Sequence, residues 1–371
     1  MYKSLRRHTQ KLILKSIKAH LTAEREYIPL LCKTFFYPTK SVSGISFGEF
    51  FRDINLEKRV TKDFLIPKYN EILQRYKKLD PSIKLEGWPK HYAIKLNLIH
   101  GVLANGKNII LSFPGALGIQ SKKMEDYFSF ELIDIWSKIF RTIIFPCMDR
   151  AFTLETKEKI KQIFCKDKDI EYISYLTSIF HEVGHHVGPW RIFPRWNTNK
   201  RISKFQHSIL TELATDSLLV DRLYDFEEII LCVFLQRLFW FGRDGFDSDE
   251  RCGNVNKDND CWIGSYLWEK YTESGCIKNT ERGLEVNIER IPQTFQVICS
   301  EINLLAAELE RANFSHHISI VQRWMNRNLR HDKEGFLLPE GFIEVLLKCR
   351  EIPYSVLSKS NDVSQRGPSI E

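Results

Sequence analysis

Two histidines and a glutamate stand close together at His181, Glu182 and His185, in the spacing His-Glu-x-x-His. Side chains four residues apart lie on one face of a helix, so the two imidazoles can meet at one metal ion. The glutamate beside them is then placed to act as a general base on a water molecule. These residue types at this spacing predict a hydrolytic zinc site.

The surrounding residues predict the helix that such a site needs. The apolar residues that repeat at helical spacing are Ile173, Leu176, Phe180 and Val183. The neighbouring face carries the histidines together with the small residues Ser174 and Ser178, and Gly188-Pro189 is predicted to end the helix one turn past His185. In a chain with 11 histidines, the competing interpretation is a pair of core histidines that have only protein partners.

A third metal ligand is predicted in the next helical segment, residues 207–224. Glu212 and Asp216 lie one turn apart there, among leucines and alanines, and burial of two acids is costly unless each has a partner. Zinc would be the partner of Glu212, and the second ring nitrogen of a ligating histidine would be the partner of Asp216. The alternative is an ordinary solvated helix face that carries two acids.

Taken together, these motifs resemble the dipeptidyl-peptidase III family of zinc metallopeptidases, of the gluzincin type. The resemblance is to the divergent branch whose motif has five residues, and it extends over about residues 171–277. It rests on the His-Glu-x-x-His motif followed by Gly188-Pro189, and on His-Ser-x-x-x-Glu-x-x-x-Asp from His207 to Asp216. Two further segments, residues 238–242 (Leu-Phe-Trp-Phe-Gly) and 264–270 (Gly-Ser-Tyr-Leu-Trp-Glu-Lys), resemble later segments of that branch.

The resemblance implies a role for each matching residue. It implies that His181, His185 and Glu212 bind one Zn²⁺ ion, that Glu182 activates water, and that Asp216 orients a ligand. The chain departs from the family pattern at His186, where the branch usually has glycine, and it lacks the His-Gly pair that normally follows the Phe-Gly segment. Complete members of the family are also longer than this chain.

Additional donors are needed for the oxyanion that forms when water attacks a carbonyl. His207, Tyr266 and Tyr271 are the candidates for this catalytic role, because they lie in the segments that resemble the family. Each is also a residue type that often has a purely structural role.

Composition and patterning set the fold class. A chain of 371 residues that is 43% hydrophobic can bury a large core, and a net charge of +7 without a concentrated basic stripe argues against nucleic-acid binding. We expect a mostly α (α+β) fold, with a zincin-like helical catalytic core and a small N-terminal β-containing lobe. The expected parts are an N-terminal lobe (1–150), a helical zinc-binding lobe (151–357) and a flexible tail (358–371).

Local patterns predict several elements outside the zinc helices. Residues 92–98 alternate as a strand that we expect to form a hairpin through Asn105-Gly106 with residues 109–111, and residues 124–140 read as a helix. As an edge strand, residues 92–98 would offer an extended peptide a pairing partner. The long segment 242–264, rich in Gly, Asp and Asn, is predicted to be disordered or to line the rim of a cleft.

The remaining signals concern localisation. Nine scattered cysteines without a Cys-x-x-Cys pair predict free thiols and a cytoplasmic protein, although Cys252, Cys261 and Cys276 cluster loosely enough to raise the question of a second metal. The most apolar run, residues 229–241, is too short to span a membrane. The basic amphipathic start, residues 1–23, is either an ordinary packed helix or a segment for peripheral membrane contact or targeting.

The sequence therefore favours a zinc metallohydrolase that cleaves a peptide or a small amide. A second hypothesis is a zinc-binding module of the same fold that has lost catalysis, and a third is a zinc hydrolase that acts on a small non-peptide molecule.

Overall fold

The computed structural model describes residues 74–78, 90–94, 110–114, 127–164, 170–185, 187–190, 202–243, 259–328, 331–332 and 335–352. The basic segment 1–23, His186, residues 244–258 of the predicted loop and the tail 358–371 lie outside the described residues. The chain divides into two compact units. Unit 1 comprises Met1–Leu65, Lys84–Trp136 and Leu357–Glu371, and unit 2 comprises Ile66–Ile83 and Ser137–Val356. The division into lobes at residue 150 stays a prediction.

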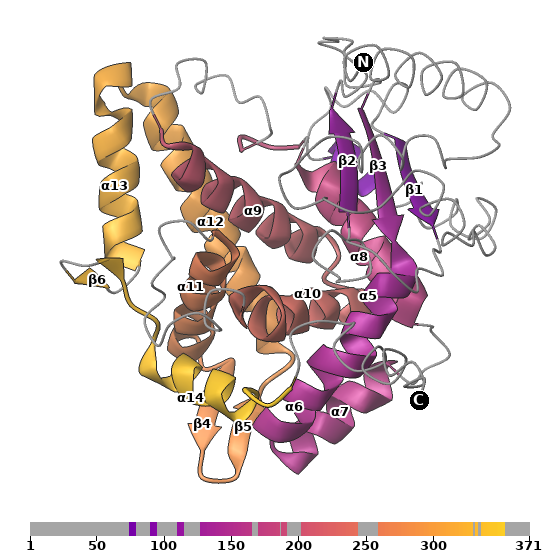
Figure 1. The fold of residues 1–371 in the computed structure, drawn as a ribbon. Helices are drawn as coiled ribbons and strands as arrows, with labels where there is room; N and C mark the ends of the chain where they lie inside the picture. Colours follow the sequence, from indigo (N-terminus) through magenta and orange to yellow (C-terminus); the bar gives the residue numbers. More distant parts are fainter. Residues whose placement is uncertain are drawn as a thin grey trace, which may run out of the picture. The chain divides into compact units, whose positions relative to one another are not determined.

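Unit 1 contains a three-stranded sheet formed by β1 (Lys90–Ile94), β2 (Ile110–Pro114) and β3 (Tyr127–Leu132). The strand order is β1-β3-β2, with β1 parallel and β2 antiparallel to β3 (Figure 1). The predicted strands at 92–98 and 109–111 overlap β1 and β2, but the predicted hairpin between them is wrong, because both strands pair with β3 and not with each other.

The predicted helix from Met124 to Phe140 is also wrong in its first part. Residues Tyr127–Leu132 form β3, and the helix α5 (Ile133–Ile139) begins only after it. Phe128, Phe130 and Leu132 alternate with more polar residues, and this period of two, in a run rich in aromatic residues, favours a strand over a helix.

Unit 2 is helical, as the sequence predicts. Besides the helical residues 74–78, its described helices are the π-helix η3 (Phe140–Ile144), α6 (Phe145–Ala151), α7 (Leu154–Phe164), α8 (Ile170–Gly184), α9 (Lys204–Arg222), α10 (Glu227–Phe239), the 3-10 helix η4 (Phe241–Arg243), α11 (Asn259–Glu273), α12 (Arg290–Arg311), the 3-10 helix η5 (Phe314–His316), α13 (His317–Asn328) and α14 (Glu340–Lys348). Two short antiparallel pairs, missing from the sequence-based prediction, join β4 (Ile277–Thr280) to β5 (Gly283–Val286) and β6 (His331–Asp332) to β7 (Gly335–Phe336).

Helix α10 occupies the core of unit 2. Every residue of α10 from Glu228 to Phe239 is buried, which explains why this stretch is the most apolar run of the chain. The helix contacts α8, α9, α11 and α12, so it lies among the helices that carry the predicted site (Figure 1). Among the described residues, no helix combines the length and apolar character that a membrane span requires.

Helices α8 and α9 pack closely at the predicted metal motif. A Cβ atom on Gly184 would lie 2.8 Å from Cγ2 of Thr215, so only glycine fits here without a shift of the neighbouring side chain. Helix α8 ends at Gly184 and not at Gly188-Pro189 as predicted. The amide of His185 still donates to the carbonyl of His181 over 3.2 Å, which preserves the four-residue helical spacing of the two histidines.

The cysteines that the structure describes carry free thiols, in agreement with the sequence-based expectation. They are Cys147, Cys232, Cys261, Cys276, Cys299 and Cys349.

Candidate metal centre

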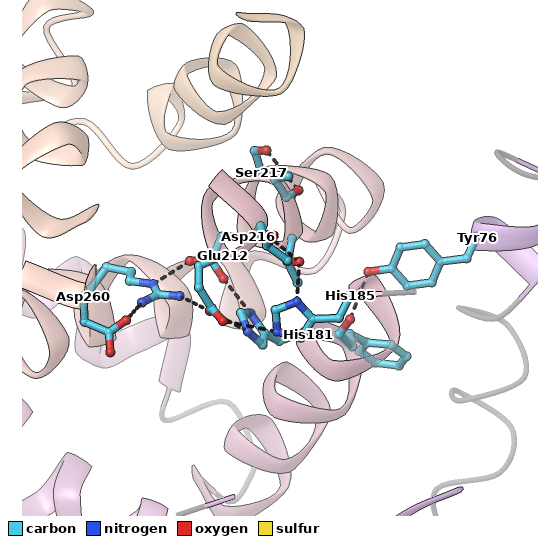
Figure 2. Close-up of polar contacts among 12 residues, drawn as sticks. Tyr76, His181, His185, Glu212, Asp216, Ser217 and Asp260 are labelled. Carbon is cyan, nitrogen blue, oxygen red and sulfur yellow. Dashed lines mark hydrogen bonds and ion pairs between the residues drawn. The ribbon is translucent and has the colours of Figure 1, made fainter. Parts of the chain in front are cut away.

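Helices α8 and α9 bring His181, His185 and Glu212 together (Figure 2). One ligand atom from each of the three residues lies within 4.8 Å of the others. Nε2 of His181 is 3.0 Å from Oε2 of Glu212, and Nε2 of His185 is 3.4 Å from Oε1. Ligands about 2.0 to 2.1 Å from a tetrahedral zinc ion are about 3.3 Å apart. Two imidazoles and a carboxylate are a ligand set of zinc, and their donor atoms here lie within 4.8 Å of one another, with the two short distances made to different oxygens of Glu212.

The electrostatics of the three residues favour a cation between them. Burial would lower the pKa of His181, but Glu212 and then Asp216 outweigh it and hold the pKa well above its ordinary value. Burial would likewise raise the pKa of Glu212, yet His185 and His181 hold it well below its ordinary value. The site therefore holds a positive charge, either a proton or a metal ion, and metal binding would release the proton.

Asp216 determines which nitrogen of His181 faces this point. Its Oδ1 lies 2.8 Å from Nδ1 of His181, and an ionised carboxylate can only accept a hydrogen bond. Burial raises the pKa of Asp216, but Arg237 and His181 outweigh it and lower the pKa, so the carboxylate is ionised. His181 therefore donates from Nδ1 and turns Nε2 toward Glu212, as the sequence predicts for a carboxylate that supports a ligating histidine.

Thr215 determines the tautomer of His185 in the same way. Its hydroxyl donates to the carbonyl of Thr211 over 2.8 Å, and the same oxygen lies 3.0 Å from Nδ1 of His185. A threonine hydroxyl has a single hydrogen, so the hydroxyl oxygen accepts from Nδ1 of His185. Nε2 of His185 is left to face Glu212. The sequence-based prediction missed this role, although Thr215 stands directly before Asp216.

Arg237 on α10 is the second residue that the prediction missed. Its guanidinium contacts Asp216 (2.5 Å), Asp260 (2.7 Å) and Glu212 (3.1 Å), and its side chain is 4% exposed. The sequence did carry a signal for this contact. A charged residue within the most apolar run of the chain must find partners when that run is buried.

Tyr76 supports the backbone just before the metal motif. Its hydroxyl donates to the carbonyl of Phe180 over 3.2 Å, and its side chain is fully buried (Figure 2). Burial raises the pKa of this phenol, which remains neutral and able to donate. No local pattern predicts this contact, because more than 100 residues separate the two positions.

The predicted general base, Glu182, lies on α8 between the two histidines and is buried. Its carboxylate makes no hydrogen bond or ion pair with another residue in the described part of the chain. A buried carboxylate of this kind is available to a water molecule or a substrate.

The three other predicted catalytic residues have different surroundings. Tyr266 donates to Oε2 of Glu301 over 3.0 Å, which joins α11 to α12. Tyr271 is buried between the rings of Phe234 and Phe295, and its hydroxyl has no hydrogen-bond partner among the described residues. His207 lies in the second turn of α9, where burial lowers its pKa, and it is not a member of the metal-ligand group. An oxyanion role for these residues stays a prediction.

Each of the two later segments that resemble the family, residues 238–242 and 264–270, contains a glycine at a point of close backbone approach. Gly242 and Gly264 face each other, and a Cβ on Gly264 would lie 2.6 Å from the Cα of Gly242. A Cβ on Gly242 would lie 2.6 Å from the carbonyl oxygen of Arg237. This close approach of η4 and α11 places Asp260 within reach of the Arg237 side chain.

Comparisons with known proteins agree with the fold predicted from these motifs. No protein-family model and no curated protein sequence matches the chain. Among solved structures, the chain is similar to DPP III from Caldithrix abyssi, with 13% sequence identity and a TM-score of 0.56 over 82% of this chain and 55% of that one. It is also similar to dipeptidyl-peptidase III from Corallococcus sp. strain EGB, with 11% identity and a TM-score of 0.52 over 79% of this chain and 51% of that one.

These likenesses confirm the predicted resemblance at the level of the fold. The structural match extends over about four fifths of the chain, well beyond the residues whose sequence motifs carry the resemblance. The chain spans about half the length of the two solved structures. The shared fold is that of the two dipeptidyl-peptidase III structures.

Proposed function

We propose that the protein is a zinc-dependent metallohydrolase that cleaves a peptide or amide bond. The observation that supports this most strongly is the meeting of two histidine Nε2 atoms and the Glu212 carboxylate within 4.8 Å of one another, with both histidines fixed in the ligating tautomer. His181, His185 and Glu212 would hold the ion, and Asp216 and Thr215 would orient the histidines. A zinc ion so held polarises a carbonyl and lowers the pKa of a bound water toward 7.

Glu182 would carry the proton during the reaction. Glu182 takes a proton from the attacking water as the oxygen adds to the carbonyl carbon, and it passes this proton to the nitrogen when the carbon–nitrogen bond breaks. Its position next to a ligating histidine and the absence of a competing ion pair among described residues suit this role. The shared fold and the chemistry of the ligand set support a peptide or a small amide as the substrate class.

A second candidate is a zinc-binding module of the same fold that has lost catalysis, which the missing His-Gly pair after the Phe-Gly segment favours. The chain spans about half the length of the two similar solved structures. The same span argues against carrying over the exopeptidase specificity implied by the neighbours' names.

The Glu182→Gln variant separates the two candidates. We expect it to bind zinc as the wild type does and to lose at least a hundredfold of any hydrolytic rate, because Gln cannot accept the proton. Zinc content is measured by atomic emission. Hydrolysis is followed by mass spectrometry on short peptides with free or blocked amino termini and on small amides. Zinc binding without turnover by the wild type would support the binding module, and a wild type without zinc would overturn both candidates.

A further inference from the structure

Like His181, Arg237 contacts both Glu212 and Asp216 through side-chain nitrogens, but it reaches them from α10. Each of its three nitrogens faces a different carboxylate, and the guanidinium carbon lies 4.6 Å from the centre of the Phe241 ring. The planar fork of arginine makes this arrangement, which a lysine ammonium cannot reproduce. The guanidinium is therefore fixed in orientation as well as in position.

These contacts form a closed ring with the first histidine. His181 faces Glu212 through Nε2 and donates to Asp216 through Nδ1. Arg237 donates to both of these carboxylates, which closes the ring. The proposed third ligand and the residue that orients the first ligand are thus held by one side chain. The three carboxylates that contact Arg237 exceed its charge by two, which is the charge of one divalent cation.

The two oxygens of Glu212 differ in their surroundings. Oε2 accepts a hydrogen bond from Nη2 of Arg237 over 3.1 Å and also lies 3.0 Å from Nε2 of His181. Oε1 faces Nε2 of His185 at 3.4 Å and accepts no hydrogen bond from the guanidinium. A hydrogen bond from a cation withdraws electron density from the oxygen that accepts it, so Oε1 is the better donor to a metal ion.

We propose that Arg237 is a positioning residue that holds Glu212 by Oε2 and thereby limits it to binding a metal through Oε1 alone. This inference rests on the proposed function. A glutamate that bound through both oxygens would fill an additional coordination position. Ligation through one oxygen gives three protein ligands and leaves the fourth position open for water, which is the arrangement of catalytic zinc sites.

The test compares the wild type with the Arg237→Lys variant in the full chain, loaded with zinc or cobalt. Zinc-edge X-ray absorption counts the nitrogen and oxygen neighbours of the metal, and the visible spectrum of the cobalt form reports coordination number, because four-coordinate Co²⁺ absorbs more strongly than five-coordinate Co²⁺. We expect about four neighbours in the wild type. In the variant we expect an additional oxygen neighbour, weaker cobalt bands and a zinc affinity about 10- to 100-fold lower.

Two further variants keep the test decisive. Arg75→Lys changes another arginine that contacts a carboxylate, Asp225, and is expected to leave both spectra unchanged. Asp260→Asn weakens only the contact between Arg237 and Asp260, and it serves as the test if Arg237→Lys does not fold. It should shift the cobalt spectrum in the direction expected for Arg237→Lys, by a smaller amount.

The outcomes distinguish this inference from the proposed function. A wild type that already shows two Glu212 oxygens at the metal, or an unchanged spectrum in every folded variant at positions 237 and 260, would overturn the role of Arg237 and leave the zinc site intact. A wild type that binds neither metal would overturn the proposed function itself.

Discussion

Two polar clusters of the helical unit differ in how their charges are satisfied. The metal cluster consists of His181, His185, Glu212, Asp216 and Arg237, and the Glu301 cluster consists of Tyr266, Lys270 and Glu301. In the Glu301 cluster, the carboxylate accepts from the Tyr266 hydroxyl at 3.0 Å and from the Lys270 ammonium at 2.9 Å. Every strong donor there meets an acceptor.

In the metal cluster, by contrast, some acceptors face one another without a donor. The hydrogens on Nδ1 of both histidines are committed to Asp216 and Thr215, so both Nε2 atoms turn toward the oxygens of Glu212. Nitrogen and oxygen lone pairs that face each other repel unless a proton or a metal ion lies between them. The Glu301 cluster is satisfied by its own side chains, whereas the metal cluster needs a proton or a metal ion between its nitrogens and oxygens.

We expect the largest effect from removal of one histidine of the metal cluster, which should abolish the stabilisation of the protein by zinc. At a zinc concentration about a thousand times its Kd, the wild type should gain about 4 kcal/mol in free energy of unfolding. The His185→Ala variant should gain almost nothing, because the site loses one of its three ligands. Urea unfolding with and without zinc measures both values. The Tyr266→Phe variant, altered in the Glu301 cluster, should keep the full gain, and an equal gain in His185→Ala would contradict the assignment.

Replacement of Thr215 tests a smaller change in the metal cluster, because it removes only the hydrogen bond that orients His185. Thr215→Val removes the acceptor for Nδ1 of His185 and should lower zinc affinity about 10- to 100-fold, or about 1.4 to 2.7 kcal/mol. Competition with a chromophoric chelator measures the affinity. Thr215→Ser keeps the hydroxyl and serves as the matched control. Equal affinities for Val and Ser at this position would show that the hydrogen bond does not orient His185.

The Tyr266→Phe variant tests the self-satisfied cluster itself. Loss of the Tyr266 hydroxyl removes one hydrogen bond from Glu301 and leaves the Lys270 bond in place, so we expect a loss of about 1 kcal/mol in free energy of unfolding. Zinc affinity should not change. A large loss of zinc affinity, or of activity with stability preserved, would instead favour a direct role for Tyr266 in the reaction.

The Arg75–Asp225 pair supplies the smallest effect, since an exposed ion pair contributes little. Asp225→Asn should cost less than about 1 kcal/mol at neutral pH. The hydrogen bond from Arg75 lowers the pKa of Asp225, so this contribution is present above the ordinary carboxyl pKa and is lost as the pH falls through the lowered value. The difference in stability between wild type and variant should therefore vanish in acid, and a difference that persists there would indicate a role other than the ion pair.

How far the sequence predicts the site depends on the distance between the residues involved. The helical period relates His181 to His185 and Glu212 to Asp216, so each pair could be predicted from spacing alone. We predicted that the two pairs meet because two histidines need a third ligand to bind zinc, and two buried acids need partners. Arg237, Asp260 and Tyr76 reach the site from other elements, and no local period encodes those contacts.

The fold shows the same limit. Long amphipathic helices such as α8 and α9 were predictable because their apolar residues repeat over several turns. The strand β3 was not, because six residues with a period of two precede a helical segment without a clear boundary. The pairing of β1 and β2 with β3 depends on contacts between distant segments, which a local hairpin pattern does not reveal.

A crystal of the zinc-loaded protein, measured at the zinc absorption edge, tests directly whether these three side chains bind the metal. We expect one strong anomalous peak per chain, about 2.0 to 2.2 Å from Nε2 of His181, Nε2 of His185 and one oxygen of Glu212. A peak bound by other residues, or no peak between these three side chains at saturating zinc, would contradict it.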